Sequence, residues 1–183
     1  FINFKRQYPS ILFPGKTEYK IGDRASDFPS KRIIDSINPL TWIQAVKQIR
    51  EFDSEWAIFR YWNPFFAPLI GYIAGKLRKK SIKVAVLIDN LVPHEESFLD
   101  SWMARRILGR ADHVITMSKS VSQDVQTHHP GMKTSTLFHP LYEIYRSSHT
   151  KAEARAKLNL PQHPIVLYFG LIRPYKGDRK SVV

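Results

Sequence analysis

Residues 83–95 read KVAVLIDNLVPHE, an apolar run that ends in a cluster of polar and ionisable residues. The apolar residues Val84 to Ile88 are continuous rather than alternating, which is typical of a strand buried on both faces of a parallel sheet. In open α/β sheets, ligands bind outside the carboxyl ends of such strands. Asp89, Asn90, His94 and Glu95 are therefore candidate site residues. An Asp-Asn pair after a strand is also common turn chemistry, and a single His is often structural, so both interpretations stay open here.

Strand and helix signals alternate along the first 140 residues. Short β-favouring or apolar runs predict strands near 7–13 and at 56–62, 83–88, 113–117 and 133–138, with a loop over 22–31. Between the later strands, Asn-Pro pairs at Asn38 and Asn63 begin helices, and Ser118 or Ser120 can cap another. Because parallel strands need such crossovers, this order predicts an α/β fold, a Rossmann-like parallel sheet with helices on both faces.

Two apolar stripes predict which helix faces are buried. One repeats every three residues from Leu40 to Ile49, and we expect it to pack on a sheet. The other follows residues 98–108 and consists of Phe98, Leu99, Trp102, Met103, Ile107 and Leu108. The basic remainder of that helix is compatible with anionic lipid, although core packing explains the stripe without lipid. The cations from Lys76 to Lys80 are likewise either a membrane or nucleic-acid patch or a solvated helix end that complements the helix dipole.

The pattern changes near Pro140, where we place a domain boundary. Residues 141–163 are expected to form a linker with a short helix capped by Thr150. A new apolar strand is expected from Pro164 to Phe169, followed by a loop, so residues 164–177 would begin a second Rossmann-like domain. The tail DRKSVV resembles the translation of a sequencing adapter, and we expect residues 178–183 to be non-native.

The loop after this last strand contains Gly170, Arg173 and Lys176. Glycine allows a ligand or another backbone to approach closely, and two cations three residues apart can hold a diphosphate, Arg by its planar fork and Lys as a point charge. A solvated loop with ordinary charges is the alternative. The sequence thus predicts a phosphate-binding loop without proving one.

Composition limits the classes of function. The 183 residues contain 28 Lys and Arg against 16 Asp and Glu, a formal net charge of +12, so the surface should attract phosphates of nucleic acid, lipid or nucleotide. The absence of cysteine excludes disulfides, thiolate metal ligands and cysteine nucleophiles, and is compatible with a reducing cytoplasm. No apolar run reaches the length of a membrane-spanning helix. An ordinary apolar fraction of 43% excludes disorder as the main state.

The passages YPSILFPGK, FRYWNPFFAP, IDNLVPHE and FGLIRPYKG together resemble family 4 glycosyltransferases of the GT-B fold. The first three resemble one bacterial subgroup, and the fourth matches the wider family's G-x-x-R-x-x-K-G pattern through Gly170, Arg173, Lys176 and Gly177. The resemblance extends from Phe1 to Gly177. It implies two Rossmann-like domains and retaining transfer of a hexose from a nucleotide sugar in the cleft between them, as in the synthesis of cell-envelope polysaccharide.

On this resemblance, residues 1–140 are the acceptor-side domain without its first strand, and Arg173 and Lys176 hold the donor diphosphate. His94 and Glu95 become catalytic candidates, while Ser118 and His139 stand at strand ends facing the cleft. Many relatives have a His-Asn pair where this chain has Asp89-Asn90. The family's Glu-x7-Glu motif lies further downstream, so this stretch alone should be inert.

The resemblance also implies the partners: a nucleotide sugar as donor, a glycan or lipid-linked acceptor, no metal or other cofactor, and a cytoplasmic enzyme in peripheral contact with the inner face of the membrane. Two alternatives stay open. One is a basic nucleic-acid-binding module, suggested by the charge and by aromatic residues near Arg60, although we expect no nucleic acid. The other is a non-enzymatic Rossmann-like binding domain.

Overall fold

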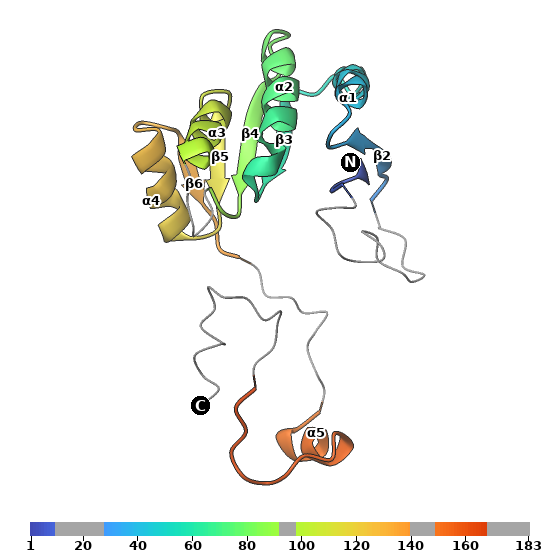
Figure 1. Ribbon diagram of the computed structural model, residues 1–183, viewed down its shortest axis with the longest axis vertical. Helices are drawn as coiled ribbons and strands as arrows, with labels where there is room; N and C mark the ends of the chain where they lie inside the picture. The colour runs from blue at the N-terminus through green and yellow to red at the C-terminus, as the bar shows by residue number, and fades with distance from the viewer. Residues whose placement is uncertain (10–27, 92–97, 140–148, 168–183) are drawn as a thin grey trace. The chain divides into compact units, whose positions relative to one another are not determined.

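The computed structural model describes residues 1–9, 28–91, 98–139 and 149–167. The chain divides after Pro140 into two compact units, residues 1–140 and 141–183, which are described separately. Figure 1 shows the first unit as strands with helices packed beside them. None of the helices in these ranges is long and apolar enough to cross a membrane.

The first unit contains two parallel sheets. The larger has the strand order β3-β4-β5-β6, and the smaller pairs β1 with β2. The strands are β1 Ile2–Arg6, β2 Lys31–Asp35, β3 Trp56–Tyr61, β4 Lys83–Ile88, β5 His113–Thr116 and β6 Thr134–Thr136. β3 and β4 pair without a register shift from Trp56 opposite Lys83 to Tyr61 opposite Ile88. The predicted Rossmann-like parallel α/β fold is confirmed.

Helices follow the strands at the predicted places. They are α1 Pro39–Glu51, the 3-10 turn η1 Pro64–Phe66, α2 Ala67–Arg78, α3 Phe98–Leu108, α4 Lys119–His128 and, in the second unit, α5 Lys151–Lys157. The predicted caps are present: the Asn38 side chain accepts a hydrogen bond from the Leu40 amide at 3.1 Å, and Asn63 accepts from the Phe65 amide at 2.9 Å. These bonds satisfy amides that the first turn leaves free, so the Asn-Pro pairs determine where both elements begin.

The hydrophobic core lies between the larger sheet and helices α2, α3 and α4. Val84, Val86 and Ile88 are almost completely buried on this face of β4. The helices supply mainly Ile73 and Leu77 of α2, Ile107 and Leu108 of α3, and Val125 of α4. α2 contacts α3 and α3 contacts α4 (Figure 1). Because each fully buried aliphatic side chain contributes about 1.5–3 kcal/mol, this layer is the main source of stability.

The opposite face of the larger sheet is more open. Ile58 of β3 alternates with the core-facing residues Ala57 and Phe59, and it is 68% exposed. Ala85 of β4, which is opposite Ile58 in the register, is buried, so exposure on this face is greatest at β3.

Asp112 connects the start of β4 to the neighbouring elements through hydrogen bonds and an ion pair. Its carboxylate accepts a hydrogen bond from the Val84 amide at 2.8 Å and forms an ion pair with Arg78 at 3.1 Å, and its own amide donates to the Val84 carbonyl. This one side chain connects the end of α2 to the amino ends of β4 and β5.

The predicted buried stripes are only partly correct. In α1, Leu40 is 73% exposed and Ile43 is also exposed, whereas Ala45 is buried and Trp42 is partly buried against the core. A strict three-residue repeat drifts around a helix of 3.6 residues per turn, so positions nine apart stand about 180° from each other. α1 packs on α2 and on β2 of the smaller sheet, which agrees with the predicted packing on a sheet. In α3, likewise, Phe98, Leu99 and Trp102 are exposed and the second half of the helix supplies the buried residues.

Two predictions near the amino end were wrong. The first strand is Ile2–Arg6, and Gln7 to Pro9 are not in a strand, because Pro9 has no amide to donate; residues 10–13 lie outside the described ranges. The strand Lys31–Asp35 was missed, since the Gly, Ser, Asp and Pro residues before it read as one continuous loop. It pairs with β1 through two register shifts.

In the second unit, Thr150 caps α5 as predicted and forms a capping box with Glu153. The predicted strand from Pro164 is not formed over residues 164–167, and Val166 is fully exposed. A strand needs a neighbour to take its ladder hydrogen bonds, and no other strand occurs among the described residues of this unit. Residues 168–177 lie outside the described ranges.

Candidate functional site

The candidate site is the carboxyl edge of the larger sheet. The pairing register aligns Tyr61, Ile88, Thr116 and Thr136 in one row across the four strands. The residues that follow this row therefore lie along one edge. Four of the predicted site residues lie at this edge of the sheet: Asp89, Asn90, Ser118 and His139. The other five, His94, Glu95, Gly170, Arg173 and Lys176, lie outside the described residues, and their roles stay predictions.

Two interactions with the neighbouring strand β3 fix the position of Asp89. Its Oδ2 forms an ion pair with Arg60 Nε at 2.8 Å, and its amide donates to the Tyr61 carbonyl at 3.0 Å. Its other carboxylate oxygen, Oδ1, is buried without a hydrogen-bond partner. An unpaired buried acceptor costs about 1–3 kcal/mol, so this oxygen lowers the stability of the protein. The ion pair holds the Arg60 guanidinium, whose side chain is 60% exposed, at this edge of the sheet.

Arg60 is a site residue that the sequence interpretation missed. It is opposite Leu87 in the register, so it lies on the same face as Asp89, two residues further along β4. An Arg in one predicted strand and an Asp just past the end of the next was the signal that could have found the pair. Asn90, next to Asp89, has an exposed side chain.

Ser118 and His139 occupy the ends of β5 and β6. The Ser118 side chain accepts a hydrogen bond from the Val121 amide at 3.2 Å and so caps α4, as predicted. His139 is exposed. Between these strands the hydroxyls of Thr116 and Thr136 share a hydrogen bond of 3.1 Å. That bond fixes the two strand ends relative to each other, which keeps the edge regular.

Tyr61 places a phenol inside the core at this edge. The side chain is fully buried, and its hydroxyl has no hydrogen-bond partner among the described residues. Burial, with a smaller contribution from the negative charge of Asp100, raises the pKa of the Tyr61 hydroxyl well above its ordinary value of 10.0. The sequence interpretation treated Tyr61 only as a strand residue, because nothing in its pattern shows that the hydroxyl lacks a partner.

Replacing Tyr61 with Phe should stabilise the protein by about 1 kcal/mol at neutral pH, because it removes a buried unpaired hydroxyl. In the wild type, the unfolded chain releases the Tyr61 proton above about pH 10 while the folded chain keeps it, so stability falls by about 1.4 kcal/mol per pH unit there. Urea unfolding of both proteins at pH 7, 9 and 11 measures this difference. Parallel stability curves between pH 9 and 11 would contradict the assignment.

Within the described residues, no group of three or more His, Asp or Glu side chains is arranged to hold a metal ion. Comparison of the chain with protein-family models, with curated proteins and with solved structures finds no match.

Proposed function

We propose that the protein is part of a retaining glycosyltransferase that moves a sugar from a nucleotide-sugar donor to a glycan or lipid-linked acceptor. The main support is the grouping of Asp89, Asn90, Ser118 and His139 at the carboxyl edge of a parallel sheet. Ligands of open α/β sheets bind at that edge. The four sequence passages that resemble family 4 glycosyltransferases support the proposal independently.

In this proposal the donor diphosphate is bound by Arg173 and Lys176, with Gly170 allowing close approach. Their charges stabilise the nucleoside diphosphate as it leaves, so the reaction needs no metal cofactor. His94 and Glu95 contact the transferred sugar or the acceptor. The enzyme works at the cytoplasmic side of the membrane, in peripheral contact with it.

Asp89 takes a positioning role here. Its carboxylate is paired with Arg60, so the ion pair, rather than a free base, occupies the place where many relatives have His.

The test is sugar transfer by the full-length protein. The purified enzyme is incubated with a panel of labelled nucleotide sugars and with membrane extract as acceptor, and the anomeric configuration of the product is determined by NMR. Transfer with retention is expected. Transfer with inversion would contradict the proposed class, and no transfer or hydrolysis of any donor would contradict enzyme function.

The alternative of a nucleic-acid-binding module rested on the positive charge and on the aromatic residues beside Arg60, and the second of these arguments is weakened. The aromatic residues beside Arg60 are in the core: Tyr61 is fully buried, and the Trp62 ring lies 4.6 Å from that of Phe66. Tyr61 is therefore not available to stack on a base, and Trp62 is partly buried. Steep, sequence-independent binding of DNA across a salt series would nevertheless favour this alternative over ours.

A further inference from the structure

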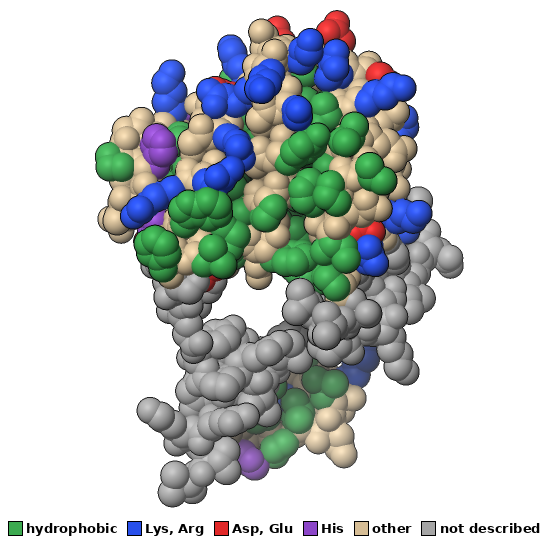
Figure 2. Space-filling view, turned by 45° about the horizontal axis from the view of Figure 1, so that its top comes forward, with side chains coloured by type: hydrophobic (Ala, Val, Ile, Leu, Met, Phe, Trp, Pro, Cys, Tyr) green, Lys and Arg blue, Asp and Glu red, His purple; other side chains and the backbone are tan. Residues whose placement is uncertain are grey.

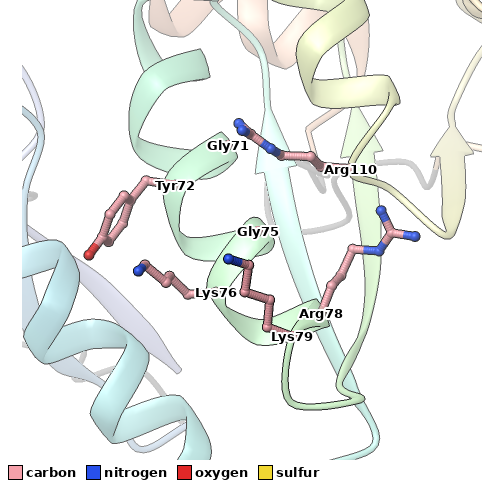
Figure 3. Close-up of a pocket in the computed structure, with 7 residues that line it drawn as sticks. All are labelled: Gly71, Tyr72, Gly75, Lys76, Arg78, Lys79 and Arg110. Atoms are coloured by element: carbon pink, nitrogen blue, oxygen red, sulfur yellow. The ribbon is translucent and has the colours of Figure 1, made fainter.

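A basic groove runs along the second half of α2. Its volume is about 560 Å³, and its lining contains four cations, Lys76, Arg78, Lys79 and Arg110. Figure 3 shows Arg110 reaching from the turn after α3 toward Gly71, while Lys76 and Lys79 project from the next turns of α2. We call this cavity the α2 groove. Because α2 ends just before β4 begins, the groove lies near the amino ends of the strands, away from the candidate site at their carboxyl edge.

Two glycines of α2 determine where the Arg110 side chain lies. A Cβ at Gly71 would lie 2.7 Å from Arg110 Nη1, and one at Gly75 would lie 3.5 Å from Arg110 Nε. The guanidinium can occupy this position only because Gly71 has no side chain. The α2 groove therefore contains a partly buried guanidinium that lies against the helix.

The positive charge of the α2 groove is largely uncompensated within the described part of the chain. Arg78 has an acidic partner, but the side chains of Lys79 and Arg110 have neither an ion pair nor a hydrogen bond there. The ammonium group of Lys76 lies 5.5 Å from the centre of the Tyr72 ring. None of the described residues that line the groove is acidic. Three uncompensated cations favour a ligand with more than one negative charge.

An apolar hollow adjoins the α2 groove and shares Tyr72 and Arg110 with it. Its volume is about 350 Å³, and its lining includes Trp42, Trp102 and Met103. The rings of Trp42 and Tyr72 are 5.9 Å apart, and Trp102 is 47% exposed. Both cavities have the size of small-molecule sites. The hollow therefore offers aromatic surface to a flat ring directly beside the cations of the groove.

The two adjoining surfaces distinguish between classes of ligand. Figure 2 shows Lys and Arg side chains gathered over one part of the first unit, with hydrophobic side chains beside them. A free phosphate would contact only the cations, and a neutral sugar would leave the cations uncompensated. A nucleoside diphosphate uses both surfaces, since its phosphates accept charge-assisted hydrogen bonds and its base stacks on aromatic rings. Arg110 lines both cavities, so it is placed to contact the phosphate nearest the ribose.

We propose that the α2 groove and the adjoining hollow together bind a nucleoside diphosphate. Lys76, Lys79 and Arg110 hold the diphosphate, and the base lies against Trp102 in the hollow. These residues belong to the first unit and are not those of the predicted donor loop at residues 170–177. This binding does not depend on sugar transfer, and a failure of one proposal leaves the other intact.

Isothermal titration calorimetry tests the proposal with ADP, UDP and pyrophosphate as ligands. The starting protein is the 183-residue chain with Arg173→Gln and Lys176→Gln, so that the predicted donor loop does not contribute to binding. The groove variant adds three substitutions to it: Lys76→Gln, Lys79→Gln and Arg110→Gln. Because each charge-assisted hydrogen bond contributes about tenfold or more to affinity, the groove variant should bind ADP at least about 100-fold more weakly. No binding of ADP to the starting protein at millimolar concentration would overturn the proposal.

Two further variants separate the groove from the general positive charge of the protein. The control variant removes three exposed cations elsewhere: Lys119→Gln, Lys133→Gln and Lys151→Gln. Its affinity for ADP should stay close to that of the starting protein, and a loss equal to that of the groove variant would overturn the proposal. Gly71→Ala keeps every charge but places a methyl group where Arg110 Nη1 lies, so ADP should bind about tenfold more weakly. Unchanged affinity in this variant would likewise count against the site.

Trp102→Ala tests the part of the site that takes the base. Stacking of a base on an aromatic ring contributes about tenfold to affinity, so ADP and UDP should bind about tenfold more weakly while the affinity for pyrophosphate stays unchanged. Pyrophosphate bound as tightly as ADP would assign the groove to a free phosphate, and single-stranded RNA bound more tightly than ADP would assign it to nucleic acid; either result would overturn the proposal. Circular dichroism checks folding. If the groove variant unfolds, the double variant Lys76→Gln, Lys79→Gln replaces it and should lose about tenfold or more.

Discussion

Replacing Phe66 with Ala is expected to lower the free energy of unfolding by about 3–5 kcal/mol, the range for truncating a buried aromatic side chain. Phe66 is fully buried in η1. Four other rings surround it with centroids 4.6–5.3 Å away: Phe4, Tyr8, Trp62 and Phe65. Phe4 and Tyr8 come from the segment of the smaller sheet, whereas Trp62 and Phe65 follow the larger one. Truncation therefore leaves a cavity where the two sheets meet.

Urea unfolding of the Phe66→Ala protein measures this loss, and Phe98→Ala is its matched control. Phe98 is 87% exposed, so the same chemical change there should alter stability by less than about 0.5 kcal/mol. Similar losses in the two variants would contradict the packing described for η1. A selective loss of near-ultraviolet circular dichroism in the Phe66 variant would report directly on the disturbed aromatic cluster.

Replacing Arg173 with Ala in the full-length enzyme should reduce turnover by about 10²- to 10³-fold, the effect of removing one preorganised group that stabilises developing charge. Lys at this position should recover part of the loss, since it restores the charge but not the planar fork. His94→Ala should also lower turnover strongly. Arg50→Ala, an exposed arginine of α1, is the control and should leave turnover unchanged. Wild-type rates for Arg173→Ala and His94→Ala would remove both residues from the site.

The larger sheet could be predicted because its sequence signals are local. The continuous apolar run of β4 and the Asn38 and Asn63 caps each act within a few residues, and each prediction agrees with the structure. The buried face of α1 could not be predicted in the same way, because it depends on contacts with α2 and β2 rather than on the repeat beginning at Leu40.

The sequence predicted where the candidate site lies, but not which of its side chains pair with one another. Strand order places Asp89 and Ser118 at one edge, but the Arg60–Asp89 ion pair depends on the register between two strands, which composition does not specify. The position of Arg110 beside α2 could not be predicted from the sequence either. Gly71 and Arg110 are far apart in sequence, and only the packing of α2 against the residues after α3 brings them together. The sequence from Lys76 to Lys80 alone favoured a solvated helix end.

The strand order β3-β4-β5-β6 has a consequence for how the protein forms. Each strand pairs with the next one along the chain, and one helix makes each connection. No strand of this sheet pairs with a strand that is distant in sequence. Each pairing therefore costs only the loop-closure entropy of one crossover connection. During synthesis the sheet can grow from β3 as each strand and helix leaves the ribosome. A nascent chain ending after β5 should already protect the β3–β4 amides from hydrogen exchange.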